Sequence, residues 1–266
     1  AGSYRAMLVQ QRQKELHDRL RASVMVRRLK ADVLKDLPSK RRQIILVEPA
    51  NAKSLIAAEN AVLNKKRAEL MALKHENAVQ KLQVFRGAAL AEISRIRHET
   101  ALAKVPAVID HLFDMLDQCN KIFVCVHHHD VGDAIAAALP AVTVQFDGRV
   151  DQKERDARVA RFQTDKSVRV FVGSIRAAGL GLTLTAASVV LFAELDWTPA
   201  AMVQAEDRLH RIGQKDSVLV HHLVIDGSID QKMAQILIDK SIMIDSILDG
   251  KVPETMNQNI LDEVLK

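Results

Sequence analysis

The sequence predicts an α/β protein, with a doubly wound parallel sheet preceded by a helical protrusion and followed by a terminal helix. From Val105 onward, apolar runs alternate with helical stretches. The runs are β-branched and nearly continuous, as expected for strands that are buried on both faces. Before that point, residues 53–101 are rich in Ala, Leu, Lys and Glu, with apolar positions near helical spacing.

The first hundred residues are predicted to be mostly helical. A charged amphipathic helix is expected over residues 5–22 and a second helix over 24–34, ended by Leu37-Pro38. A short apolar strand follows at Ile44–Val47. Residues 53–101 then predict a helical hairpin or protruding arm, in which Gly87 marks a possible break. A coiled-coil surface is possible there, but the heptads are irregular.

The later elements follow from the same alternation. The expected strands are Ile122–Val126, Val142–Phe146, Val168–Val172, Val189–Ala193 and Val218–Val224. The expected helices are Val131–Leu139, Gln152–Gln163, Pro199–Ile212 and Ser228–Leu248. The predicted organisation is a linking segment over residues 1–50, a protrusion over 51–103, an α/β domain over 104–250 and a tail over 251–266.

Composition narrows the function classes. The chain has 266 residues, of which 48% are hydrophobic and 3% aromatic, so its core must be aliphatic. No apolar run is long enough to span a membrane, and no secretory signal opens the chain. Cys119 and Cys125 form no metal-binding pair and are expected to be reduced in an intracellular protein. The opening Ala1-Gly2-Ser3 resembles a tag remnant, so we expect an excised fragment, monomeric by itself.

The net charge of +5 is unevenly distributed. Residues 1–100 hold 21 Lys and Arg against 10 Asp and Glu, whereas residues 101–266 hold 17 against 23. A basic first section is compatible with a nucleic-acid backbone as partner. Solvated amphipathic helices explain the same excess, so charge alone leaves both interpretations open.

Residues 204–214, QAEDRLHRIGQ, are the most informative segment. Gln204, Arg208 and Arg211 stand at i, i+4 and i+7, so one helix would carry all three on one face. Thr198 suits its N-cap, and Pro199 and Gly213 suit its first position and its C-cap. Paired guanidiniums suit phosphate oxygens. A solvated face with internal ion pairs has the same spacing.

Glycines and polar residues follow several predicted strands. Ser174 follows one strand, and the Gly179-Leu180-Gly181 turn comes shortly after it. Ligands of doubly wound sheets bind beyond the carboxyl ends of strands, where glycine lets the backbone approach a phosphate. A tight turn into the next strand is the alternative.

The remaining candidates are one turn, one aromatic and one histidine run. Gly148 and Arg149 precede a helix whose amides could receive a phosphate, although an ordinary turn would look alike. Trp197 is the only tryptophan and lies between a strand and a helix, where it could stack on nucleic acid or pack internally.

His127-His128-His129 follow a strand and point in different directions, and strand alternation separates His221 from His222. We therefore expect no metal site of the kind that histidine clusters form.

Four blocks in order resemble the Swi/Snf family of DNA-dependent ATPases, which are superfamily-two helicases. They are VRRLKADVLKDLPSK at 26–40, RAAGLGLTL at 176–184, FAELDWTP at 192–199 and the 204–214 segment. The family's fourth motif and the block after it correspond to the histidine run and to residues 146–155. The FAEL string and the Gly-Leu-Thr variant look closest to the annealing-helicase, or HARP-like, branch.

The resemblance implies a RecA-like second motor lobe with a bracing terminal helix. It implies that ATP binds between two lobes, that Arg208 and Arg211 act as arginine fingers and that Gln204 senses the nucleotide. By the same resemblance, the 179–181 loop couples nucleotide to DNA. The residues implied to lie near the DNA backbone are His127, His128, Gly148, Arg149, Ser174 and Trp197.

No Gly-x-x-x-x-Gly-Lys-Ser/Thr loop occurs in the sequence. Asp262-Glu263 follows no strand and does not resemble a magnesium-binding box. The triphosphate cradle and the Mg²⁺ ligands are thus expected on a first lobe, and this chain alone is expected to be inactive. A non-catalytic DNA- or protein-binding module with the same fold and an unrelated nucleotide-binding enzyme are the alternatives.

Overall fold

A computed structural model describes residues 11–12, 14–15, 18–19, 21–24, 34, 36–75, 79–178, 181–248 and 264. The helices expected over residues 5–22 and 24–34 fall mostly outside these ranges, as do Gly179, Leu180 and nearly all of the tail. Within the described part, no helix combines the length and the apolar character needed to cross a bilayer.

The centre of the molecule is a six-stranded sheet in which every neighbouring pair is parallel. The strand order is β1-β6-β5-β2-β4-β3, so the chain crosses the sheet repeatedly, as in doubly wound folds. The predicted fold class is therefore confirmed. The strands are β1 (Lys40–Leu46), β2 (Ile122–Val126), β3 (Thr143–Phe146), β4 (Val170–Ser174), β5 (Val189–Phe192) and β6 (Val218–Val224).

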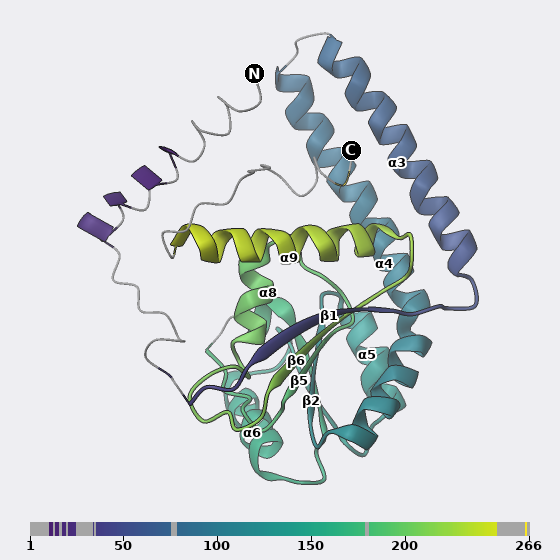
Figure 1. Ribbon diagram of the computed structural model, residues 1–266. Coiled ribbons are helices and arrows are strands. Elements are labelled where there is room, and N and C mark those ends of the chain that lie inside the picture. Colours follow the sequence, from purple (N-terminus) through teal and green to yellow (C-terminus); the bar gives the residue numbers. More distant parts are fainter. Residues whose placement is uncertain are drawn as a thin grey trace.

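Helices cover both faces of the sheet (Figure 1). They are α3 (Ala52–His75), α4 (Val79–Gln118), α5 (His129–Ala138), α6 (Gln152–Thr164), α7 (Ile175–Ala178), α8 (Pro199–Glu206) and α9 (Ile229–Leu248).

Alternate residues of the strands build two separate cores. Phe123, Phe171 and Phe192 face a core shared with α6, α8 and α9, whereas Val124 and Leu191 face a core shared with α4 and α5. All five of these side chains are fully buried. Because side chains on a strand alternate between faces, one continuous apolar run supplies both cores.

The linking segment contributes the edge strand of this sheet. β1 starts four residues before the predicted Ile44–Val47 strand and pairs along its whole length with β6, from Lys40 opposite Val218 to Leu46 opposite Val224. Exposed and partly buried residues alternate in β1, so its first half contains no apolar run and was not predicted.

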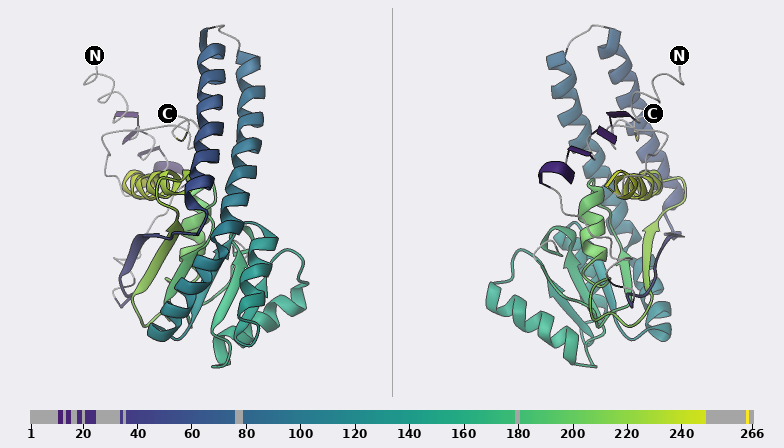
Figure 2. Two further views of the ribbon diagram at one scale, coloured as in Figure 1. Left: turned by 90° about the vertical axis from the view of Figure 1, so that its right-hand side faces the viewer. Right: turned by 60° about the vertical axis from the view of Figure 1, so that its left-hand side comes forward.

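The protrusion is a pair of long helices that projects from the sheet (Figure 2). α3 ends at His75 and α4 begins at Val79, so Gly87 does not mark the break: it lies inside α4. α4 continues through Pro106 to Gln118 and thus passes the expected boundary between residues 103 and 104. Its later half packs on the sheet through Val108 and Leu112.

Gly173 is required by close packing between β4 and β2. A Cβ atom added there would lie 2.9 Å from Cε2 of Phe123, a fully buried ring. By contrast, a Cβ added at Gly87 would meet nothing within 4 Å. The two glycines therefore have opposite roles in stability.

We predict that Gly173→Ala lowers the free energy of unfolding by about 1–3 kcal/mol, because the core must shift to admit the methyl group. The matched change Gly87→Ala should raise it by up to ~1 kcal/mol, because glycine is unfavourable inside a helix. Urea unfolding followed by circular dichroism measures both. Equal effects of the two substitutions would contradict this account of the packing.

Candidate nucleotide and DNA sites

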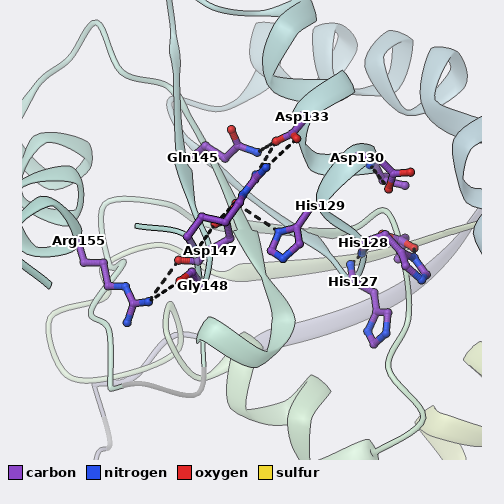
Figure 3. Close-up of polar contacts among 12 residues, drawn as sticks. His127, His128, His129, Asp130, Asp133, Gln145, Asp147, Gly148 and Arg155 are labelled. Carbon is purple, nitrogen blue, oxygen red and sulfur yellow. Dashed lines mark hydrogen bonds and ion pairs between the residues drawn. The ribbon is translucent and has the colours of Figure 1, made fainter. Parts of the chain in front are cut away.

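The carboxyl edge of the sheet gathers most of the expected DNA-contacting residues. Because all strands are parallel, the segments that follow β2, β3, β4 and β5 emerge at one edge. His127 and His128 follow β2, Ser174 ends β4, and Gly148 comes two residues after β3. A small pocket at this edge is lined by both histidines, Asp147 and Ser174. Figure 3 shows the histidine run beside the Asp147–Gly148 turn.

One buried carboxylate organises the histidine run. Glu194 accepts the backbone N–H groups of His127 and His128 at 2.8 and 2.9 Å, and His128 Nδ1 donates to its second oxygen at 2.6 Å. Burial by itself raises the pKa of Glu194, but the bonds from His128 and the two amides bring this pKa below its usual value. The carboxylate is therefore ionised and fixes the His128 ring.

A second carboxylate connects the run to the tryptophan segment. Asp196 Oδ2 lies 3.6 Å from His127 Nδ1, and its Oδ1 accepts the N–H of Thr198 at 2.9 Å. Arg176 approaches the same carboxylate at 4.0 Å. Trp197 is half-buried against the core, and the guanidinium of Arg97 lies over its ring. Asp196 thus links the segment that follows β2 to the segment that follows β5.

Arg149 is already engaged by two carboxylates. Its guanidinium contacts Asp133 at 2.6 and 2.9 Å and Asp147 at 2.6 to 3.1 Å. These bonds lower the pKa of Asp133 to about 2 and raise the pKa of Arg149. The first amides of α6 are partly occupied too, because the N-cap Asp151 accepts from Glu154 N. A phosphate at this turn would compete with these carboxylates.

The arginine segment is not one continuous helix. α8 ends at Glu206, so Gln204 lies on the helix whereas Arg208 and Arg211 lie in the turns beyond it. The prediction of a single helical face was therefore wrong. The carbonyl of Arg208 accepts from Leu184 N at 2.9 Å, which directs the chain away from the helix.

The predicted caps were also only partly right. Pro199 is the first residue of α8, but Thr198 makes no side-chain cap bond. Gly213 does adopt a left-handed conformation, with φ of 98°. It does not end α8, whose C-cap is Asp207. It ends the turn over residues 207–213 that carries Arg208 and Arg211, which we call the arginine turn.

The arginine turn is bonded to the glycine loop. Arg211 Nη1 donates to the carbonyl of Leu182 at 3.0 Å, next to Gly181, which has a φ of 80°. Burial and the neighbouring charge of Arg211 lower the pKa of Arg208. The loop leads into β5 and the turn into β6, so this second site lies toward the amino ends of the strands.

Three comparisons with known proteins bear on these sites. The helicase conserved C-terminal domain family matches residues 103–213. The chain is 37% identical over 218 residues to a SWI/SNF-related matrix-associated actin-dependent regulator of chromatin subfamily A-like protein 1 homolog from Caenorhabditis elegans. It is 38% identical over 241 residues to the DNA annealing helicase and endonuclease ZRANB3 of Homo sapiens. These matches cover 79% and 89% of the chain.

Solved structures agree with the sequence relatives. The Sulfolobus solfataricus SWI2/SNF2 ATPase core domain matches with a TM-score of 0.58 at 25% identity, over 86% of this chain and 48% of that one. The same core in complex with dsDNA matches with a TM-score of 0.56 at 27% identity, over 85% of this chain and 50% of that one.

The chain belongs to the Swi/Snf family. Its sheet and flanking helices match the RecA-like C-terminal lobe of the family's ATPase core. The chain spans 29% and 21% of the lengths of the two relatives named above.

The important residues that sequence reasoning missed in this Swi/Snf lobe are carboxylates. Glu194 and Asp196 were visible as acidic residues directly after a strand, but nothing in the sequence assigned them to the histidines. Glu206 was read only as part of the arginine segment. It is 1% exposed and forms a two-pronged pair with Arg42 at 2.7 and 2.8 Å and a contact with Lys40 at 2.7 Å.

The ionised form of Glu206 is favoured in the folded chain. Burial alone raises its pKa, but the pair with Arg42 and the charge of Lys40 lower it below the ordinary 4.5. A lowered folded pKa gives stability that is fully present above pH 4.5 and is lost as the pH falls through the folded pKa.

We predict that Glu206→Gln lowers the free energy of unfolding by about 3 kcal/mol at pH 7, because two partly buried cations lose the buried carboxylate that they share. The difference from the unsubstituted chain should shrink as the pH falls below 4.5. Glu154→Gln is the control, since Glu154 pairs with Arg158 on an exposed helix face and such pairs contribute little. Urea unfolding between pH 3 and 7 tests this, and a difference that does not change with pH would contradict it.

Proposed function

We propose that this chain is the second motor lobe of an ATP-dependent double-stranded DNA translocase with strand-annealing activity. The observation that carries the proposal is the bonded pair of segments in which Arg211 donates to Leu182 and Leu184 donates to Arg208. Two neighbouring arginines beside a glycine loop concentrate positive charge where a phosphate can approach the backbone. The relative named as a DNA annealing helicase supports the annealing branch.

In the proposed site, ATP lies between this lobe and a first lobe that supplies the phosphate-binding loop and the Mg²⁺ ligands. Arg208 and Arg211 place positive charge against the γ-phosphate as negative charge develops, and the exposed Gln204 reports nucleotide occupancy. Arg211 would exchange the Leu182 carbonyl for a phosphate oxygen. The glycine loop, including Gly179 and Leu180, then passes the nucleotide state on toward the DNA edge.

DNA is the proposed partner of the carboxyl edge. The Sulfolobus solfataricus SWI2/SNF2 ATPase core that matches this chain forms a complex with dsDNA. His127, His128 and Ser174 line one small pocket there, and Asp196 lies between His127 and the Trp197 segment. Arg149, in contrast, would first have to release Asp133 or Asp147. We also propose that the protein acts inside the cell and that this chain is monomeric when separate from the first lobe.

We predict that DNA-stimulated ATPase activity appears only when a Swi/Snf first lobe is supplied with this chain. Arg208→Ala and Arg211→Ala should each lower the rate about 10³-fold or more, as loss of a finger does in related NTPases. Arg161→Ala on α6 is the control, since its side chain is exposed and pairs with Asp165. A phosphate-release assay measures all four proteins. A correctly folded two-lobe complex without activity would favour the binding-module alternative.

We predict that this chain alone neither hydrolyses ATP nor binds it tightly, because the phosphate cradle and the Mg²⁺ ligands are not in its sequence. Isothermal titration with Mg·ATP and a turnover assay check this. Turnover by the pure chain that Arg211→Ala abolishes would contradict it.

A further inference from the structure

Two successive residues of α4 reach the proposed DNA surface from the helical hairpin. Arg97 donates to the carbonyl of Leu195 at 2.9 Å, and its guanidinium carbon lies 4.9 Å from the centroid of the Trp197 ring. His98 is stacked on His128, with ring centroids 3.8 Å apart and an angle of 15° between the planes. One helix thus contacts two side chains that belong to different strand ends.

The orientation of Arg97 is fixed from behind by a buried carboxylate. Arg97 Nε donates to Asp230 Oδ1 at 2.7 Å, and both residues are buried. Lys104 Nζ reaches the other oxygen at 3.4 Å and the carbonyl of Leu223 at 2.7 Å. Arg97 therefore presents a flat, rigid guanidinium to Trp197, while Asp230 pairs with both Arg97 and Lys104.

His98 is also held by a carboxylate, although this one, Asp130, is exposed. Its Nε2 lies 2.8 and 2.9 Å from the two oxygens of Asp130, and the ring that it stacks on is held by Glu194. His98 therefore covers one face of the His128 ring, while Glu194 binds the edge of that ring.

The base of the hairpin is itself anchored. Glu59 of α3 accepts the hydroxyl of Thr100 and the backbone N–H of Ile229, each at 2.7 Å. Ile229 begins α9 and precedes Asp230, so α3, α4 and α9 are bonded together at one point. The α4 residues 97 and 98 are therefore carried by a rigid base.

We propose that Arg97 and His98 are positioning residues, which set the orientation of Trp197 and His128 and so connect the helical hairpin to the DNA surface. The connection to DNA rests on the proposed function, whereas the positioning itself can be measured without DNA. In this proposal, the helical hairpin fixes the orientation of side chains at the carboxyl edge of the sheet, in addition to packing on the sheet.

Trp197 reports this directly because it is the only tryptophan in the chain. Arg97→Lys keeps a cation for Asp230 but loses the planar fork that covers the ring and binds Leu195. We expect a shifted emission maximum and about twofold stronger acrylamide quenching, as the ring gains access to solvent. Arg95→Lys is the matched control, since Arg95 lies on the same helix, is exposed and pairs with Glu99. Its spectrum should equal that of the unsubstituted chain.

The same pair of proteins tests the connection to DNA by fluorescence anisotropy with a labelled duplex. We expect Arg97→Lys to weaken binding about fivefold, as partial loss of one stacking contact would. In a Trp197→Leu background the further loss should be small, because the two side chains act through one contact. His98→Gln should likewise weaken binding, and less so in a His128→Ala background.

The outcomes distinguish the positioning role of Arg97 and His98 from the proposed function. Unchanged emission and quenching in a folded Arg97→Lys protein would overturn the positioning role whether or not DNA binds. Effects on affinity that simply add in the double variants would overturn it as well, since they indicate that the two side chains act independently. An unsubstituted chain that binds no duplex would instead contradict the proposed function, and the fluorescence comparison would still decide the positioning role.

Discussion

The arrangement of the arginine turn depends on one buried ion pair. Glu206 ends α8, and the two cations that hold it, Lys40 and Arg42, come from β1 at the edge of the sheet. These residues are more than 160 positions apart in the chain. Because an unpaired charge cannot remain in that position without a large cost, the edge strand and the end of α8 must be formed together. The turn that carries Arg208 and Arg211 starts at that fixed point.

Buried carboxylates also fix the orientation of polar side chains at the carboxyl edge of the sheet. Glu194 holds His128, Asp196 approaches His127, and Asp230 holds Arg97. Each of these acids is buried, so its bonds are strong and directional in a medium of low polarity. The side chains that these acids hold thus have fixed orientations, which in the proposed function would lower the entropy lost on binding DNA.

The sequence predicted the layers of this fold much better than its polar contacts. Strands such as Ile122–Val126 are uniformly buried, so their apolar runs located them within one or two residues. β1 was half missed because Arg41 and Gln43 alternate with its inward-facing residues. The extent of α8 was overestimated because helical spacing continues past Glu206, whereas a bond from the distant Leu184 to the Arg208 carbonyl redirects the chain.

The polar contacts of the two candidate sites were hard to predict for the same reason. The resemblance of the motif blocks made Arg208, Arg211, His128 and Trp197 candidates, because those residue types are themselves part of the motifs. Their partners could not be identified, since an acid such as Asp230 looks like any exposed helix residue in the sequence. Pairing across the fold is set by the strand order, and no local pattern encodes that order.

The geometry of α8 connects the two proposed sites physically. The helix begins two residues after Trp197 and ends two residues before Arg208, and its eight residues span about 12 Å. Met202 and Ala205 fix it to the core, so it can transmit a displacement only as a rigid body. A shift of the arginine turn on nucleotide binding would therefore reach the Trp197 segment unless the contacts of Arg97 and Asp196 resist it. In the proposed function, the contacts of Arg97 with Trp197 and with the Leu195 carbonyl would thus limit how far such a displacement moves the Trp197 segment.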